Sequence, residues 1–163
     1  MVEPKRAHWA TTKHVLRYMQ GTVDYGLLYT KSKEMRLSGF TDANWAGSSV
    51  DQKSTFGYCF NTRSGMTSWC SRKQKSVALS SAEVEYMATS TASCEAIWLR
   101  KLLVNLFRRK MEATKIKSDN QSCIKLSKNP VFHDRSKHID IRCHFVRDCV
   151  QRGAVLLSYT LTE

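Results

Sequence analysis

The chain lacks three features that mark secreted or membrane proteins. None of its six cysteines forms a C-x-x-C pair, and most stand in apolar contexts such as Tyr58-Cys59-Phe60, which favours free thiols in a reducing compartment over disulfides. No apolar run approaches the length of a membrane span. No signal peptide is visible, because residues 1–5 lead straight into a polar helix. We therefore expect a cytoplasmic or nuclear protein with no membrane partner.

Acidic residues are also scarce. Asp and Glu number 14 against 26 Lys and Arg, so the formal net charge is +12, and the pI is about 9.6. Such a balance favours a polyanionic partner, and nucleic acid is the obvious one. The alternative is that the charge serves solubility alone. Two basic clusters, 72–75 and 108–110, are candidates for binding phosphates, and Lys73 is the representative of the first.

The pattern of apolar and turn residues predicts a mixed α/β domain preceded by a helix. Residues 1–35 are expected to form a leading helix (4–20, opened by Pro4 and stopped by Gly21) and a connector. Residues 36–163 would form the main domain, with a five-stranded sheet flanked by helices. Its expected strands are 36–42, 55–62, 66–72, 114–118 and 154–160, and its expected helices are 80–107, 120–127 and 136–151.

Three of the scarce acids are placed to meet at one point. Asp42 closes the first strand of the main domain, Asp119 ends the fourth, and Glu85 lies one turn into the long helix. If the first and fourth strands are parallel neighbours at the sheet centre, their carboxyl ends bring Asp42 and Asp119 together, and the helix adds Glu85. Converging carboxylates repel one another unless a divalent cation neutralises them, and oxygen ligands suit Mg²⁺ or Mn²⁺. Two such ions could support phosphodiester hydrolysis, with Asp42 bridging them.

Several short motifs together carry a family resemblance. The chain resembles the ribonuclease H domain of copia-type LTR retrotransposon Pol polyproteins, and the leading helix resembles the segment that links reverse transcriptase to that domain. The motifs are Asp42-Ala43-Asn44-Trp45-Ala46-Gly47, Lys53-Ser54-Thr55, Gly57-Tyr58, Ser68-Trp69, Lys73-Gln74, the run from Ala78 to Ala88, Glu95-Ala96-Ile97-Trp98-Leu99, Ser118-Asp119-Asn120-Gln121-Ser122 and Lys137-His138-Ile139-Asp140-Ile141-Arg142.

The resemblance implies a ribonuclease H-like fold and cleavage of the RNA strand of RNA–DNA hybrids with Mg²⁺ or Mn²⁺. The family's catalytic, metal-binding acids map onto Asp42, Glu85 and Asp119, with Glu85 preferred to Glu83 because the family pattern of Glu followed three residues later by Ala matches Glu85 and Ala88. Substrate contacts are implied for Ser80, Ser81 and Gln121. The implied origin is a reverse transcriptase polyprotein.

The sequence departs from this family at its end. The family carries a fourth metal-binding acid in a closing helix, whereas this sequence reads Tyr159-Thr160-Leu161-Thr162-Glu163 and stops before that segment. We therefore expect a C-terminally truncated domain without the closing helix, and activity that is reduced or dependent on manganese. The alternatives are a catalytically impaired hybrid-binding remnant of a retrotransposon and a protein-interaction remnant.

The remaining signals favour structural roles. His133, His138 and His144, with two nearby aspartates, could suggest a metal cluster, but their spacings of five and six residues do not match helical ligand pairs. The family has a histidine that assists product release, and His138 is our candidate for that role. Two further sets have expected structural roles: solvated surface carboxylates at Glu83 and Glu95, and core aromatic residues at Trp69, Tyr86, Trp98 and Phe107.

Overall fold

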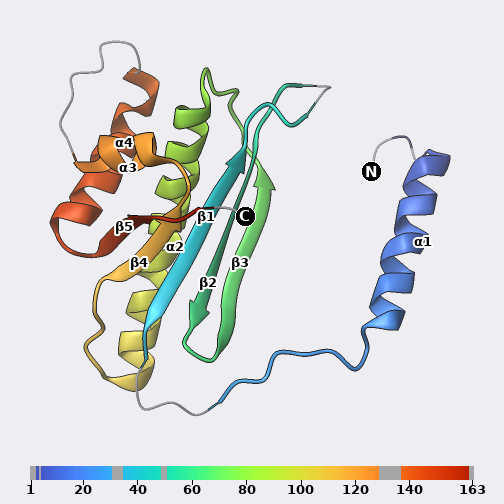
Figure 1. Ribbon diagram of the computed structural model, residues 1–163, viewed down its shortest axis with the longest axis horizontal. Helices are drawn as coiled ribbons and strands as arrows, with labels where there is room; N and C mark the ends of the chain where they lie inside the picture. The colour runs from blue at the N-terminus through green and yellow to red at the C-terminus, as the bar shows by residue number, and fades with distance from the viewer. Residues whose placement is uncertain (1–2, 4, 31–34, 49–50, 129–136, 162–163) are drawn as a thin grey trace.

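The structure of the protein is a computed structural model (Figure 1). The described residues are 3, 5–30, 35–48, 51–128 and 137–161. The elements, in chain order, are α1 (Arg6–Gly21), β1 (Leu37–Asn44), β2 (Thr55–Thr62), β3 (Gly65–Lys73), α2 (Ser81–Phe107), β4 (Thr114–Ser118), α3 (Gln121–Lys128), α4 (Lys137–Gln151) and β5 (Val155–Tyr159). Each helix and strand expected from the sequence is present, with bounds that differ by at most two residues.

The five strands form one mixed sheet in the order β3-β2-β1-β4-β5. β1 pairs antiparallel with β2 and parallel with β4, and β5 is parallel to β4. A tight turn between Thr62 and Gly65 joins β2 to β3, whereas the parallel step from β1 to β4 requires a crossover, which α2 provides. The predicted sheet and the central position of β1 are therefore confirmed.

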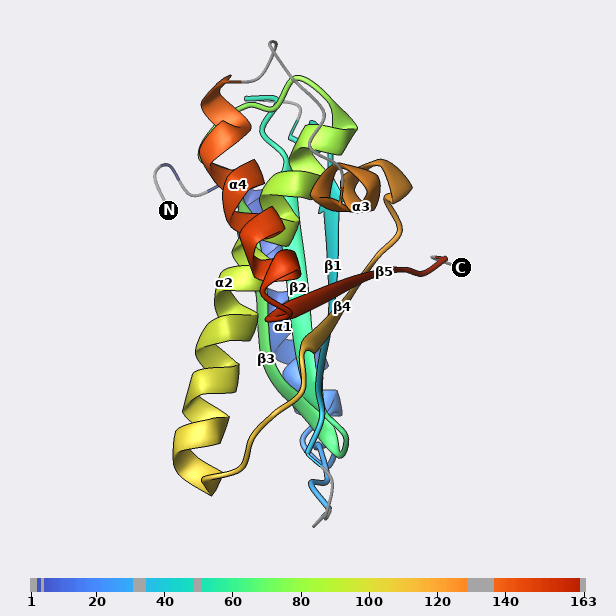
Figure 2. The same ribbon diagram turned by 90° about the vertical axis from the view of Figure 1, so that its left-hand side faces the viewer.

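Helix α2 begins at a capped N-terminus and covers the sheet along its length. The Ser80 hydroxyl accepts a hydrogen bond from the Glu83 amide at 3.2 Å, and such caps stabilise a helix by about 1 kcal/mol. The buried side chains of Tyr86, Ala92 and Leu99 belong to the same core as Phe60 and other sheet residues. Figures 1 and 2 show α4 beside α2 on the same side of the sheet. None of the helices in the described ranges is both long and apolar enough to cross a membrane.

Helix α1 stands apart from the sheet in Figure 1. No residue of α1 is buried, so the apolar stripe predicted for it, which includes Val15, Leu16 and Met19, is exposed. The connector that follows is held at the β2–β3 turn, where the Tyr29 ring lies against Gly65 and its hydroxyl donates to the Met66 carbonyl.

The prediction of four core aromatic residues is wrong for three of them. Tyr86 is 1% exposed, but Trp69 is 67% exposed, Trp98 56% and Phe107 48%. Ser68 donates to Glu95 on α2, so Ser68 faces the helix, and strand alternation turns Trp69 to the opposite face. Residue spacing cannot tell which face of a sheet or helix will be covered. Five of the six cysteines are free thiols, as predicted: Cys59, Cys70, Cys94, Cys123 and Cys149.

Candidate metal centre

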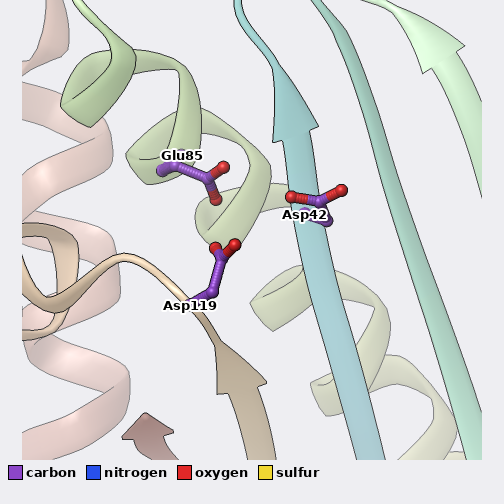
Figure 3. Close-up of side chains that lie close together, drawn as sticks. All are labelled: Asp42, Glu85 and Asp119. Atoms are coloured by element: carbon purple, nitrogen blue, oxygen red, sulfur yellow. The ribbon is translucent and has the colours of Figure 1, made fainter. Parts of the chain in front are cut away.

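Three carboxylates meet at one end of the sheet (Figure 3). Asp42 lies near the end of β1, Asp119 directly follows β4, and Glu85 lies at the start of the second turn of α2. Each offers an oxygen, and these oxygens all lie within 4.8 Å of one another. The parallel pairing of β1 with β4 is what places the two aspartates side by side, and the cap at Ser80 places Glu85 above them.

The three acids differ in their surroundings. Glu85 is 6% exposed, Asp119 is half-buried and Asp42 is exposed. One Glu85 oxygen, Oε1, accepts a hydrogen bond from the Ala43 amide at 3.0 Å. The other, Oε2, is buried and has no hydrogen-bond partner within the described part of the chain. The site is thus closed on the helix side and open at Asp42.

The surroundings of Glu85 disfavour its negative charge. The pKa of its carboxyl is raised to about 7: burial contributes most, the negative charges of Asp42 and Asp119 act in the same direction, and the Ala43 hydrogen bond opposes them. A buried oxygen with no partner and three converging carboxylates suit a hard divalent cation, which takes oxygen ligands. The residues therefore fit a site for an ion such as Mg²⁺ or Mn²⁺.

Glu83 is not the solvated surface carboxylate that the sequence predicted. It is 7% exposed rather than solvated, and its Oε2 accepts from the Leu79 amide at 2.7 Å. Its carboxylate therefore bonds the backbone just before the Ser80 cap of α2, close to the place where the glutamate of a capping box bonds the cap residue itself. This explains structurally why Glu85, not Glu83, joins the carboxylate cluster. Glu95 is also not simply solvated, since it accepts from Ser68 at 2.7 Å.

The residues predicted to contact substrate lie around this end of the fold. Ser80, Ser81 and Gln121 are exposed at the starts of α2 and α3. Lys73, at the end of β3, forms an ion pair with Asp51 at 2.8 Å and a hydrogen bond to Ser48 at 3.0 Å, so it is already engaged within the chain. Lys73 holds the pKa of Asp51 well below its usual range.

The histidines remain unassigned. His144 is exposed on α4, His133 lies outside the described residues, and His138 falls in α4 at a position whose side chain is not described. Sequence reasoning also missed two buried polar residues close to the carboxylates, Ser54 and Gln74. A signal was available, because both residues stand in motifs of the family resemblance, Lys53-Ser54-Thr55 and Lys73-Gln74, but the lysines on either side of Gln74 favour a basic surface cluster instead.

Comparison with known proteins identifies the family. A scan against protein-family models gives no match. The chain is 40% identical over 160 residues to the retrovirus-related Pol polyprotein from transposon RE2 of Arabidopsis thaliana, covering 98% of this chain and 11% of that protein. It is 42% identical over 147 residues to the corresponding polyprotein from transposon TNT 1-94 of Nicotiana tabacum, covering 90% and 11%. The chain belongs to the retrovirus-related transposon Pol family. It spans about a tenth of the length of these Pol relatives.

Another relative has a different description. The secreted RxLR effector protein 161 of Plasmopara viticola is 50% identical over 97 residues, which cover 60% of this Pol-family chain and 68% of the effector. A segment of this family therefore also occurs in a much shorter protein.

Solved structures identify the fold. LC11-RNase H1, isolated from compost, matches with a TM-score of 0.56 at 12% identity, over 77% of this chain and 84% of that one. The same enzyme in complex with an RNA/DNA hybrid matches with a TM-score of 0.54 at 8% identity, over 77% and 85%. The Pol-family sheet and its helices thus form a ribonuclease H-like fold, as predicted.

Proposed function

We propose that this domain is an endoribonuclease that cleaves the RNA strand of RNA–DNA hybrids with the help of Mg²⁺ or Mn²⁺. The observation that carries the proposal is the group of three carboxylates from β1, α2 and β4, within 4.8 Å of one another at the open end of a ribonuclease H-like sheet. A hybrid-bound solved structure of the same fold supports the choice of substrate. Membership of the Pol family supports an origin in a reverse transcriptase polyprotein.

The proposed roles follow from the surroundings of each acid. Asp42, Glu85 and Asp119 would hold the cations. Bound cations supply positive charge that activates water and stabilises the negative charge that develops on the scissile phosphate. The Ala43 amide holds Glu85 in one orientation, so the carboxylates are arranged before substrate arrives. The exposed edge at Asp42 leaves room for a phosphodiester.

Recognition of the hybrid would depend on its backbone more than its bases. The 2′-hydroxyl distinguishes the RNA strand, and polar side chains read it across a shallow minor groove. Ser80, Ser81 and Gln121 are exposed at the same end of the fold as the carboxylates and are the proposed contacts. Contacts of this kind to sugar and phosphate carry little sequence preference.

The direct test uses a hybrid whose RNA strand is end-labelled. We expect cuts in the RNA of the hybrid with Mg²⁺ or Mn²⁺, no cuts in duplex DNA or duplex RNA, and complete loss of cutting with a chelator. Gel analysis of the labelled fragments measures all of these. Tight hybrid binding without any cutting in either cation would instead support the hybrid-binding remnant, and cutting of duplex DNA at the same rate would contradict the proposed substrate.

We also predict that one of the two basic clusters contacts the hybrid. Asp42 pairs with Gly57 on β2, and Gly57 pairs with Ser71 on β3, so Ser71 lies two strands from Asp42, about 10 Å at ordinary strand spacing. The exposed residues Arg72 and Lys75, which follow Ser71, therefore lie near the carboxylates. Arg108 and Lys110 follow the other end of α2, roughly 33 Å from Glu85 along the helix. Replacing Arg72 and Lys75 together by Gln should flatten the slope of log affinity against log salt by about 2.

The matched control replaces Arg108 and Lys110 by Gln, which removes the same charge at the distant end. Fluorescence anisotropy with a labelled hybrid at several salt concentrations measures both slopes. An equal change in the two double variants would mean that the net charge of the chain, and no particular cluster, governs binding.

A further inference from the structure

The buried side chain of Gln74 connects two parts of the candidate metal centre. Gln74 directly follows β3 and is 3% exposed. Its Nε2 donates to the carbonyl of Val84 at 3.2 Å, one residue before Glu85 on α2. Its backbone amide donates to the carbonyl of Ser54 at 2.7 Å, just before β2 begins. Gln74 therefore holds the first turns of α2 against the ends of β2 and β3.

Ser54 continues this connection to β1. Its side chain is fully buried, and its Oγ accepts from the Ala46 amide at 3.0 Å. Ala46 lies two residues beyond the end of β1 and has a positive φ of 49°, a conformation that a non-glycine residue adopts only when its surroundings hold it there. The loop after β1 is thus held by Ser54.

These contacts close into a ring of hydrogen bonds. The Ala43 amide of β1 donates to Glu85, α2 continues from Glu85 to the Val84 carbonyl, and Gln74 bonds that carbonyl and Ser54. Ser54 then bonds Ala46, three residues after Ala43 along the chain. The ring includes Glu85 and Ala43, the residue that directly follows Asp42 in β1. The hydrogen bonds of the ring therefore determine the distance between the carboxylates of Glu85 and Asp42.

The hydrogen bonding of Gln74 is not optimised for stability. Its Oε1 is buried without a hydrogen-bond partner among the described residues, which destabilises the fold relative to an apolar side chain of the same shape. The Val84 carbonyl lies inside a helix, so it does not need Nε2 in order to be satisfied. What the contact adds is a fixed position for the start of α2.

We propose that Gln74 is a positioning residue that sets the spacing of Glu85 and Asp42, and so the affinity of the carboxylate cluster for a divalent cation. This inference rests on the metal site of the proposed function. Asp119 is positioned independently, since it follows β4, which pairs with β1. Loss of Gln74 should therefore loosen the cluster on the Glu85 side only.

The test compares Gln74→Met with a matched variant at the far end of the same helix. Arg100 also ties α2 to neighbouring backbone, because its guanidinium donates to the carbonyls of Met111 and Ala154 at 3.0 and 3.2 Å. Arg100→Met removes these two bonds and should lower the melting temperature without touching the carboxylates. Binding of Mn²⁺ is measured by electron paramagnetic resonance, which needs no substrate and no turnover.

We expect Gln74→Met to raise the Mn²⁺ dissociation constant by about 10-fold, as loss of a supporting contact around metal ligands does. Arg100→Met should leave it within roughly 2-fold of the wild type, because the change is distant. A second readout needs no metal: hydrogen exchange of the Ala43 amide, which Glu85 protects, should speed up in Gln74→Met and stay unchanged in Arg100→Met. Ser54→Ala, a smaller change in the same ring, should move both readouts in the same direction.

Unchanged Mn²⁺ affinity and unchanged Ala43 exchange in folded Gln74→Met would overturn the proposal. So would equal shifts in Arg100→Met, because these would show a general loss of stability. If Gln74→Met failed to fold, Ser54→Ala would decide in its place. A wild type that binds Mn²⁺ but cuts no hybrid would contradict the proposed function and leave the role of Gln74 standing.

Discussion

Replacing Asp42 by Asn should abolish metal-dependent cutting of an RNA–DNA hybrid. Asp42 is the most exposed of the three acids and the one that can serve both a cation and an approaching phosphate. An amide in its place removes a full negative charge from the cluster and leaves the fold intact, because the side chain is exposed on the strand. We expect a loss on the order of 10³-fold in kcat/KM, equivalent to about 4 kcal/mol in the barrier. Initial rates on a labelled hybrid at saturating Mg²⁺ measure it.

The matched control for this prediction is Glu83→Gln. Glu83 is also an acid at the start of α2, but its carboxylate caps Leu79 and lies outside the cluster. A glutamine retains an oxygen to accept that hydrogen bond, so the rate should stay within about 3-fold of the wild type. If Asp42→Asn cut the hybrid as fast as the wild type, the activity would belong to a contaminant or to another site.

Replacing Glu85 by Gln should make the metal-free protein more stable while removing activity. The pKa of Glu85 is raised to about 7 by burial and by the charges of Asp42 and Asp119. A carboxyl whose pKa is raised on folding stabilises the native state fully below its unfolded value, near 4.5, and loses that contribution as pH rises through about 7. At pH 8 the native chain therefore carries an unfavourable buried charge. Glutamine removes this charge and can still accept the Ala43 hydrogen bond through its carbonyl oxygen.

The expected gain is about 2 kcal/mol at pH 8, which raises the melting temperature by roughly 4–8 °C for a chain of this size. At pH 4 the Glu85 carboxyl is protonated in the folded chain and mostly protonated in the unfolded chain, so most of the difference should disappear. Calorimetry in a chelating buffer at the two pH values measures this. A lower melting temperature for Glu85→Gln at pH 8 would mean that the carboxylate is stabilised by contacts other than a cation.

Adding Mg²⁺ or Mn²⁺ should stabilise the wild type more than it stabilises Glu85→Gln. A cation bound by the three carboxylates stabilises the folded wild type by mass action, and the stabilisation rises with cation concentration. Glu85→Gln should gain much less from the same addition, because it has lost a ligand. The difference in melting temperature between Glu85→Gln and the wild type would then shrink or change sign as the cation concentration rises.

Much of the fold was predictable because its signals are local. Alternation of apolar residues in β1, the turn between β2 and β3, and Ser80 before α2 each depend on neighbours a few residues away. Burial depends on distant segments and was predicted less well. Trp69 and Trp98 look like core residues by spacing, yet they lie on faces that the described chain leaves uncovered. Gln74 looks like part of a basic surface, yet it is buried against α2.

The sequence by itself determined the fold class, the order of its elements and the positions of Asp42 and Asp119 at the ends of strands, because strand periodicity and turn residues are written into neighbouring positions. Only the tertiary structure decided that Glu83 is buried at the start of α2 and that Ser54 and Gln74 hold the elements together there. The physical reason is that the pKa and the reach of a carboxylate depend on how α2 lies across the sheet. That arrangement results from packing between residues that are far apart in the chain.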